Sequence, residues 1–459
     1  MERIITKELL QWKEMQSGRL PLVLYGARQV GKTYTLTHFG RDYYKNTIYV
    51  NFERMPVIAE FFDGSLQPER ILGFLQEYFS EKITPGDTLV IFDEIQACER
   101  ALTSLKYFAE EAPEYHIAAA GSLLGVAIHR EKYSFPVGKV IMKTMYPLRF
   151  DEFLSALGYG HLVTLIREKY DALSGNCAIT DGDSCDDADS GSEALQKSGF
   201  EMPLQTHNEI MLWLRRYLFI GGMPAVVCKY MDEQSLVNIP ELQSMILSAY
   251  TADMAKYSTA GECTKIQSAF RTLPAQLAKD NKKFQYKLIR KGATAGLFGE
   301  SISWLVMSGV ALECDRVTRG EVPLAVTQDL SSFKLYMSDV GLLCAASGIM
   351  PENIVRGDLS DISKGALAEN YVAQTLRCSG HRLFYWTSDS PEAEVDFLLQ
   401  KDGSVIPLEV KYDTNVHAKS LKHFIRMNHP KKAVRISARN FGVDEQGLYS
   451  IPLYAAFCL

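Results

Sequence analysis

The chain has 459 residues, of which 47% are hydrophobic and 23% are charged, and its formal net charge is −6. This length and composition predict about three globular domains, and the acidic balance excludes a generally basic nucleic-acid coat while leaving room for a local basic surface. We expect no membrane span, since no uncharged apolar run reaches about 18 residues, and we expect no secretory leader. The nine cysteines are scattered and lack CxxC spacing, which predicts a reduced, cytoplasmic protein.

Residues 20–150 alternate short apolar runs with helical patterns. The amphipathic stretches at 71–82 and 101–112 predict helices, and the apolar runs predict strands at 20–26, 46–52, 88–94 and 115–122. Three of these runs lack polar alternation, which is typical of strands buried on both faces. The pattern predicts an α/β domain over 1–160, with a parallel sheet covered by helices on both faces.

A connecting segment is expected over 161–204. Its stretch 176–195 has five aspartates among Ser and Gly, which predicts a disordered insertion. A metal-binding loop is the alternative, although the spacing of calcium-loop ligands is missing.

Two further regions follow, a mainly helical one over 205–330 and one over 331–459 in which strands return. Within the helical region, 265–312 is similar to a winged-helix unit. This segment contains a basic stretch, which comprises Lys279, Lys282, Lys283, Lys287, Arg290 and Lys291. The stretch either faces phosphates or is a solvated helix surface.

Residues 26–33, GARQVGKT, match G-x-x-x-x-G-K-[ST] between a predicted strand and a predicted helix. Gly26 and Gly31 allow a tight loop whose N–H groups point at phosphates, and the helix N-terminus adds a favourable dipole. Lys32 is expected to reach the β- and γ-phosphates and Thr33 to ligate Mg²⁺. The predicted ATP-binding residues are Gly26, Ala27, Arg28, Gln29, Val30, Gly31, Lys32, Thr33 and Tyr34.

Polar residues at two strand ends complete the expected site. Asp93 is predicted to join the Mg²⁺ shell and Glu94 to orient or deprotonate the attacking water, although acids here also serve as helix caps. Ser122 is a catalytic candidate if its strand lies beside that of Asp93, and otherwise caps the next segment. Arg130 and Arg149 are arginine-finger candidates by position alone.

A second site is predicted near the C-terminus, where Asp402-Gly403 indicates a two-residue hairpin. Counting outward from this turn places Asp396 opposite Glu409 and Glu394 opposite Lys411. Since side chains alternate between faces along a strand, all four are expected on one face.

Opposed carboxylates about 5 Å apart repel unless a cation or a proton relieves them. The pattern of Asp396, Glu409 and Lys411 therefore predicts a metal-dependent, nuclease-like core, to which Glu369 could add a carboxylate. The alternative is a solvated surface with an ordinary ion pair, and Pro407 indicates an edge strand.

Together these segments resemble bacterial and archaeal AAA-superfamily ATP-binding proteins that carry a C-terminal domain of unknown function. The resemblance covers most of the chain and rests on GARQVGKT, VIFDEIQ, AAAGSLLG, YPLRFDEFL, YLFIGGMPAVV, FKLYMSDVGLL, GALAENYVAQTL, LFYW, EVDFLL and PLEVKY. It implies a P-loop ATPase of the AAA type, a helical or winged-helix middle and a restriction-endonuclease-like C-terminal fold. One position differs from the family pattern, since this chain has Lys139 where the family often has Arg.

The leading expectation is a Mg-ATP-driven switch or motor whose hydrolysis reorients a nuclease-like, DNA-interacting C-terminal domain. The alternatives are an ATP-gated metal-dependent nuclease and a nucleotide-dependent protein-interaction switch without DNA contact. ATP and Mg²⁺ are the expected cofactors. The expected partners are DNA, a second copy of the chain or another protein. No association with a membrane is expected.

Overall fold

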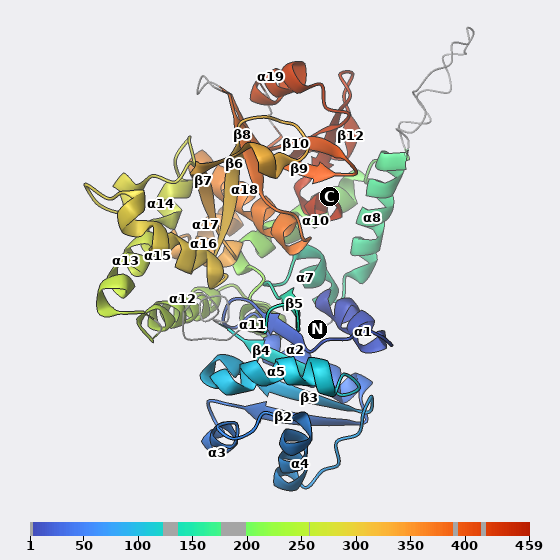
Figure 1. The fold of residues 1–459 in the computed structure, drawn as a ribbon. Helices are drawn as coiled ribbons and strands as arrows, with labels where there is room; N and C mark the ends of the chain where they lie inside the picture. Colours follow the sequence, from blue (N-terminus) through green and yellow to red (C-terminus); the bar gives the residue numbers. More distant parts are fainter. Residues whose placement is uncertain (1–2, 123–135, 176–198, 257, 389–392, 415–418) are drawn as a thin grey trace. The chain divides into compact units, whose positions relative to one another are not determined.

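The computed structural model describes residues 3–122, 136–175, 199–256, 258–388, 393–414 and 419–459 (Figure 1). They form two compact units. Unit 1 comprises Met1–Pro147 together with Ser303–Val310, and unit 2 comprises Leu148–Ile302 and Ala311–Leu459. The boundary near 147 thus precedes the expected one at 160, and the two regions expected over 205–330 and 331–459 both belong to unit 2 except for Ser303–Val310. Arg130 and the predicted insertion at 176–195 lie outside the described residues.

Unit 1 contains a five-stranded parallel sheet of order β2-β3-β4-β1-β5. Its strands are β1 (Leu22–Tyr25), β2 (Asn46–Asn51), β3 (Thr88–Asp93), β4 (His116–Gly121) and β5 (Ile141–Thr144). Its helices are α1 (Ile5–Glu14), α2 (Lys32–Tyr43), α3 (Pro56–Phe61), α4 (Pro68–Phe79) and α5 (Glu99–Glu111). The four predicted strands are confirmed, whereas β5 was not predicted, because this short edge strand is only partly buried.

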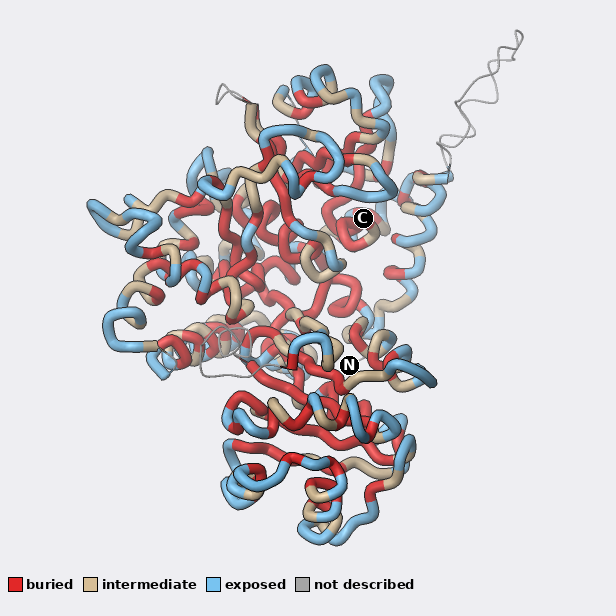
Figure 2. Tube along the Cα trace, in the orientation of Figure 1, coloured by how far each residue is buried: buried red, intermediate tan, exposed pale blue. Residues whose placement is uncertain are grey.

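Helices cover the sheet of unit 1 on both faces, as predicted. Alternate residues of the strands, among them Val50, Val90 and Phe92, form one core with α3, α4 and α5. Helix α2 packs on β2, β3 and β4, and its buried Leu36 and Phe39 lie outside that core. The central strands β3 and β4 are buried along their whole length, as the burial colours of Figure 2 show.

Unit 2 combines helices with an eight-stranded mixed sheet of order β12-β13-β11-β10-β9-β8-β6-β7. The strands are β6 (Ala311–Val317), β7 (Gln328–Met337), β8 (Phe384–Thr387), β9 (Glu394–Lys401), β10 (Ser404–Val410), β11 (Ala433–Ser437), β12 (Gly442–Val443) and β13 (Leu448–Pro452). The fold is therefore α/β, with a parallel N-terminal sheet, a helical middle and a mixed C-terminal sheet.

Eleven of the α-helices described after residue 147 lie wholly in unit 2. They are α7 (Phe150–Ala156), α8 (Gly160–Gly175), α10 (Leu204–Ile220), α11 (Pro224–Glu233), α12 (Ile239–Lys256), α13 (Ala260–Arg271), α14 (Leu273–Leu277), α16 (Val340–Ala346), α17 (Pro351–Arg356), α18 (Asp361–Cys378) and α19 (Lys419–Asn428). Helix α15 (Ala295–Met307) begins in unit 2 and ends in unit 1.

Two expectations about the C-terminal strands change. The strand of the winged-helix-like segment, β6, pairs with β7 and β8 and so belongs to the large sheet. Strand β10 lies between β9 and β11, so the edge position inferred from Pro407 is wrong. A central strand tolerates this proline because its pairing with β11 begins only at Leu408.

Two negative expectations concern cysteines and membranes. Within the described ranges, seven cysteines are present and all are free thiols. No described helix combines the length and apolar character needed to cross a bilayer.

Candidate functional site

The loop between β1 and α2 adopts backbone angles that its glycines permit. Gly26 and Gly31 have φ values of +145° and +97°, and Gly31 is the N-cap of α2. A Cβ on Gly26 would lie 2.1 Å from the carbonyl oxygen of Met145. The loop therefore requires glycine for space as well as for conformation, and it places consecutive backbone N–H groups at a helix N-terminus.

Lys32 is buried at the start of α2 and folds back over the loop. Its Nζ donates to the carbonyl oxygens of Gly26 at 3.0 Å and of Ala27 at 2.8 Å. The ammonium group therefore lies inside the loop, where a phosphate would replace these carbonyls. Arg28 and Gln29, at the tip, are exposed.

Thr33 and Asp93 contact each other across the sheet edge. The Thr33 hydroxyl lies 2.9 and 3.1 Å from the two carboxylate oxygens of Asp93. Tyr49 donates to the same carboxylate at 2.7 Å, and Asn51 at 3.4 Å. Hydroxyl and carboxylate oxygens so close together fit Mg²⁺, which prefers hard oxygen ligands.

Sequence reasoning missed Tyr49 and Asn51, although the strand 46–52 that carries them was predicted. Burial, followed by the hydrogen bond to Asp93, raises the pKa of Tyr49 to about 12. This phenol therefore stays protonated and keeps donating to the carboxylate. A polar residue at the end of a strand beside β3 is the signal that would have indicated Asn51.

Glu94 follows β3 with a left-handed backbone, φ +50°, which side-chain-bearing residues seldom adopt. Its carboxylate accepts a hydrogen bond of 2.5 Å from Nε2 of Gln96. The Oε1 atom of Gln96 is buried and has no hydrogen-bond partner in the part of the chain that the structure describes. The bend and the amide thus hold Glu94 beside Asp93, although Gln96 had not been predicted as part of the site.

The remaining candidates separate into two groups. Ser122 follows β4, which lies between β1 and β3, so the condition set for its role is met. Arg149, in contrast, is buried in unit 2, and its guanidinium makes 2.9 and 2.7 Å contacts with Asp151. The arginine-finger interpretation of Arg149 is therefore not supported, because this arginine serves as a structural ion pair. Lys139 pairs with Glu110 at 2.9 Å.

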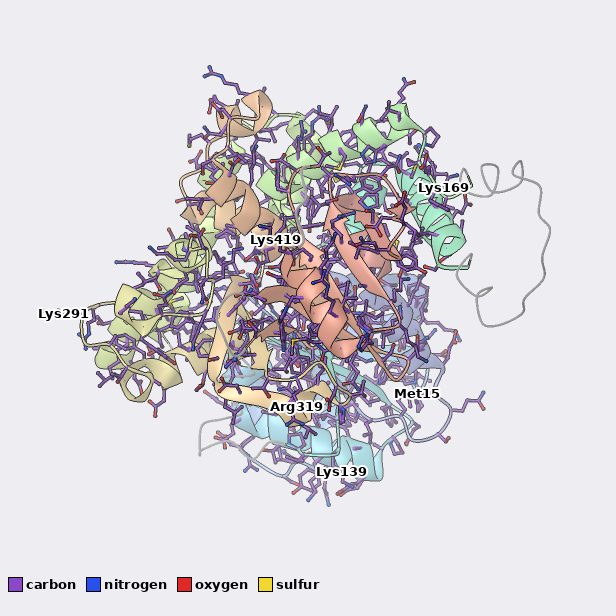
Figure 3. All side chains as sticks on the ribbon, turned by 90° about the horizontal axis from the view of Figure 1, so that it is seen from above. Met15, Lys139, Lys169, Lys291, Arg319 and Lys419 are labelled. Carbon is purple, nitrogen blue, oxygen red and sulfur yellow. The ribbon has the colours of Figure 1, made fainter. Side chains whose placement is uncertain are left out.

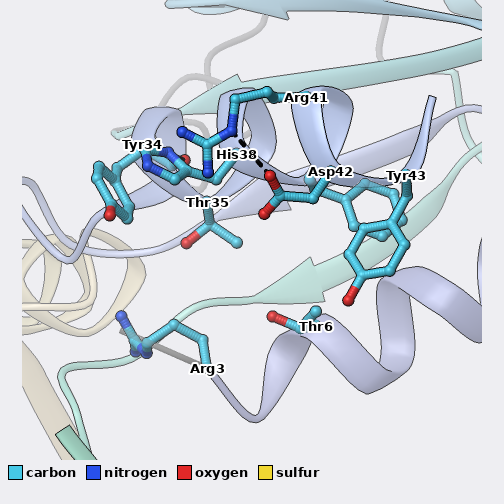
Figure 4. Close-up of a pocket in the computed structure, with 9 residues that line it drawn as sticks. Arg3, Thr6, Tyr34, Thr35, His38, Arg41, Asp42 and Tyr43 are labelled. Atoms are coloured by element: carbon cyan, nitrogen blue, oxygen red, sulfur yellow. Dashed lines mark hydrogen bonds and ion pairs between the residues drawn. The ribbon is translucent and has the colours of Figure 1, made fainter. Parts of the chain in front are cut away.

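A cavity of about 360 Å³ lies between the N-terminal segment and α2 (Figure 4). It is lined by Arg3 and Thr35, both buried, and by the stacked rings of Tyr34 and His38, whose centroids are 3.6 Å apart. Among the described residues, the Thr35 hydroxyl has no hydrogen-bond partner. Arg3 also donates to the carbonyl oxygen of Val30 in the loop. The cavity thus combines aromatic rings with polar groups that can bind a ligand.

Unit 2 contains a separate cluster of buried charges. Glu369 on α18 contacts Lys282, Lys334 and the hydroxyl of Tyr336. Lys334 has no exposed surface and also binds Glu394 at 2.5 Å. Burial opposes ionisation of Glu369, but the two lysines outweigh it and lower its pKa to about 2. Glu369 is therefore already neutralised by protein cations and not free to join a metal.

The hairpin register around Asp402-Gly403 is confirmed, as far as the pair Leu408 and Phe397. Beyond it the contacts differ from the expected ones. Glu394 binds Lys334 instead of lying against Lys411, and Lys411 pairs with Glu409 at 2.6 Å. The Asp396 carboxylate accepts the backbone N–H of Val410 at 2.7 Å.

Asp396 and Glu409 are the two acids of the cluster without full compensation. Burial, followed by the charges of Glu409 and Glu369, raises the pKa of Asp396 to about 7. Burial likewise raises the pKa of Glu409, whose Oε2 atom is buried and has no hydrogen-bond partner among the residues described. In the described part of the chain, no group of three His, Cys, Asp or Glu side chains could hold a metal. A divalent ion here would thus depend on these two carboxylates alone.

Residues 18–154 match a family described as AAA domain. Residues 211–353 and 364–455 match families described as domains of unknown function, DUF8612 and DUF4143 respectively. No curated protein matches the chain.

Three solved structures are similar over most of the chain. A Walker-type ATPase of Pyrococcus abyssi shares 13% identity, over 75% of this chain and 95% of that one, with a TM-score of 0.45. The ORC2 protein of Aeropyrum pernix, in ADPNP-ADP complexes, shares 12%, over 78% and 95%, at 0.33. Cdc6p of Pyrobaculum aerophilum shares 12%, over 78% and 96%, at 0.26.

The AAA match and the parallel sheet agree on unit 1, which has a P-loop AAA-type ATPase fold. The match over 364–455 names no fold, so the restriction-endonuclease-like assignment of this region stays a prediction.

Proposed function

We propose that unit 1 binds Mg-ATP at residues 26–34 and hydrolyses it. The observation that carries this proposal is the contact of Thr33 with Asp93, at the N-terminus of α2 and beside the buried ammonium group of Lys32. Lys32 and the loop N–H groups would hold the phosphates, and Thr33 and Asp93 would hold the ion. The ion supplies charge neutralisation at the phosphates.

Glu94 is the proposed base or orienting group for the attacking water, and Ser122 contacts the γ-phosphate or that water. The nucleobase enters the cavity between Arg3 and the rings of Tyr34 and His38, because an aromatic heterocycle suits stacked rings and a free hydroxyl.

The test compares ATP hydrolysis by the wild type with Lys32→Ala and Glu94→Gln. Both variants should lose about 100-fold or more of the rate, because each loses a group that acts on the transferring phosphoryl. Glu94→Gln should still bind ATP. Lys45→Ala is the matched control, since this exposed lysine pairs with Asp87 far from the loop in sequence. Equal rates in wild type and Lys32→Ala would reject the assignment.

We further propose that the nucleotide state is passed to unit 2, with DNA as its partner. Chain connectivity supports this, since the chain leaves unit 2 after Ile302, contributes Ser303–Val310 to unit 1 and returns at Ala311. Gly309 lies against the loop, where an added Cβ would be 3.0 Å from the nitrogen of Ala27. A protein partner without DNA contact is the alternative, supported if no DNA binding is found in any nucleotide state.

A second candidate function, metal-dependent cleavage of DNA by unit 2, is favoured by the partnerless Oε2 atom of Glu409 beside Asp396. Incubation of plasmid DNA with Mg²⁺ or Mn²⁺ should then give nicks in wild type and in Glu445→Gln, an exposed control, but none in Glu409→Gln. Intact plasmid throughout, with ATP hydrolysis retained, would leave unit 2 as a binding module.

A further inference from the structure

A strongly basic segment lies in the C-terminal part of this acidic chain. Residues 414–443 contain seven Lys or Arg residues and no Asp or Glu, while the whole chain has a net charge of −6. Such a local excess attracts polyanions even when the net charge of the protein is negative. Part of this segment is helix α19.

Helix α19 separates its apolar and basic residues onto two faces. Leu421 and Phe424 are fully buried, and Phe424 packs edge-on against Trp386 with ring centroids 5.1 Å apart. Lys419, Lys422 and Arg426 are exposed. Their i, i+3, i+7 spacing places them along one side of the helix over about 10 Å. We call these three residues the basic face.

The basic face is free to contact a ligand. No ion pair reaches its three cations within the ranges that the structure describes. Two other cations of the segment are occupied, since Arg435 binds Ser450 and Arg439 donates to the carbonyl oxygen of Thr414. The loop that touches Phe424 through Gly320 exposes Arg319 and Glu321, whose charges offset each other.

The chemistry of α19 favours duplex nucleic acid over two other polyanions. A membrane-binding helix needs a free apolar face, but that of α19 is buried in the core of unit 2. A single strand is held mainly by base stacking on exposed aromatic rings. The exposed large apolar side chain of α19 is Met427, and its exposed ring, that of His423, already stacks on Trp386 with ring centroids 6.2 Å apart. What remains are regularly spaced cations, which suit a phosphate backbone.

The basic stretch at 279–291 is a weaker candidate. Lys282 forms an ion pair with Glu369, so its charge is already compensated. Asp280 and the contact of Arg290 with the ring of Phe298 further reduce the positive charge that this stretch can offer to a ligand. The two regions are also distinct, as Lys291 and Lys419 lie in different parts of unit 2 (Figure 3). This stretch therefore offers a comparison of equal charge.

We infer that the basic face of α19 docks on the phosphate backbone of double-stranded DNA, without reading its sequence. This inference rests on the proposed DNA contact of unit 2 and names its surface. Binding through phosphates releases counterions, so it weakens steeply as salt rises.

The experiment measures the affinity of the full chain for a fluorescent DNA duplex from low to moderate salt. The variant Lys419→Gln, Lys422→Gln, Arg426→Gln should bind at least about tenfold more weakly, and the slope of log affinity against log salt should fall by about 3. The control Lys279→Gln, Lys283→Gln, Lys287→Gln removes the same charge and should change little. Thermal unfolding checks that both fold, as expected from exposed substitutions.

The outcomes separate the inference from the proposed function. If wild type binds no duplex in any nucleotide state, the DNA part of the proposed function fails. If wild type binds but the α19 variant binds equally well, or only the control variant loses affinity, the inference about α19 fails alone. Preference for a duplex RNA competitor, or for vesicles of anionic phospholipid, over the DNA duplex would also overturn it.

Discussion

Glu94 occupies a left-handed backbone conformation directly after the buried strand β3, and Gly26 approaches Met145 too closely for any side chain. Such conformations persist only where surrounding packing determines them. The bend at Glu94 brings its carboxylate to the carboxyl edge of the sheet, and the turn at Gly26 brings the N–H groups of the loop to the same edge. Gly309 belongs with them, since it has φ +74° and lies against the same loop.

At the residue scale, we predict that Gly309→Ala weakens nucleotide binding about tenfold. Its Cβ would lie 3.0 Å from the nitrogen of Ala27, so the loop has to shift. Gly292→Ala is the matched control, because Gly292 also has a positive φ but no neighbour within 4 Å of the added atom. Both variants should lose about 1–2 kcal/mol of stability from the backbone conformation. Titration with a fluorescent ATP analogue checks this, and equal affinities for the two variants would contradict it.

At the scale of elements, helix α1 and strand β4 are joined through a buried histidine. The ring of His116, at the start of β4, lies 5.6 Å from that of Trp12 on α1. Its Nδ1 atom is 2.6 Å from the hydroxyl of Tyr44, which follows α2. Burial, followed by the positive charges of Arg19 and Lys13, lowers the pKa of His116 to about 4. The elements therefore pack around a neutral imidazole.

We predict that this contact makes unit 1 less stable in mild acid. The unfolded chain takes up the proton near pH 6.5, whereas the folded protein takes it up only near pH 4. The stabilisation is thus complete above about pH 6.5 and is lost as the pH falls towards 4, by about 2 kcal/mol at pH 5.

Urea unfolding at pH 7.5 and at pH 5 checks the prediction by difference. The wild type should lose about 2 kcal/mol more than His116→Gln between these two values. His161→Gln, an exposed control, should behave like the wild type. An identical pH dependence in the wild type and His116→Gln would reject the prediction.

At the scale of the whole molecule, the chain crosses between the two units at Ser303 and again at Ala311. A ligand that binds only folded unit 1 must stabilise that unit by mass action. Since Ser303–Val310 is part of unit 1, the same ligand also stabilises a segment whose two ends continue into unit 2.

We predict that Mg-ATP at 100 times its dissociation constant raises the free energy of unfolding of unit 1 by about 2.7 kcal/mol. Lys32→Ala should show almost no increase, and Lys45→Ala the full one. Denaturant unfolding with and without Mg-ATP measures this. A transition that does not respond to nucleotide in the wild type would contradict the assignment of the loop.

Several features of unit 1 could be predicted because they are local. An apolar run of strand length, a glycine-rich turn and the first residues of a helix are adjacent in the chain, so spacing and period identify them. The same holds for the hairpin at Asp402-Gly403, where a left-handed turn sets the register. The roles of the loop, Asp93 and Glu94 remain predictions with a consistent geometry.

Other features required contacts between distant segments. The placement of β6 in the large sheet, the central position of β10 despite Pro407, and the lysines around Glu369 each depend on parts of the chain tens of residues apart. Composition indicates that Lys334 is charged, but only its position on β7 opposite α18 shows that it is buried and paired. For this reason the predicted set of four nuclease-like residues loses Glu369.

By itself the sequence determined the P-loop, the strands that frame it and the turn of the C-terminal hairpin. These depend on backbone conformations and alternation patterns that neighbouring residues settle among themselves. Only the tertiary structure decided which charges meet and which stay unpaired, because the energy of a buried charge depends on every segment packed around it. That is why Glu369 is neutralised, Glu409 keeps a partnerless oxygen, and Lys419, Lys422 and Arg426 remain open to solvent.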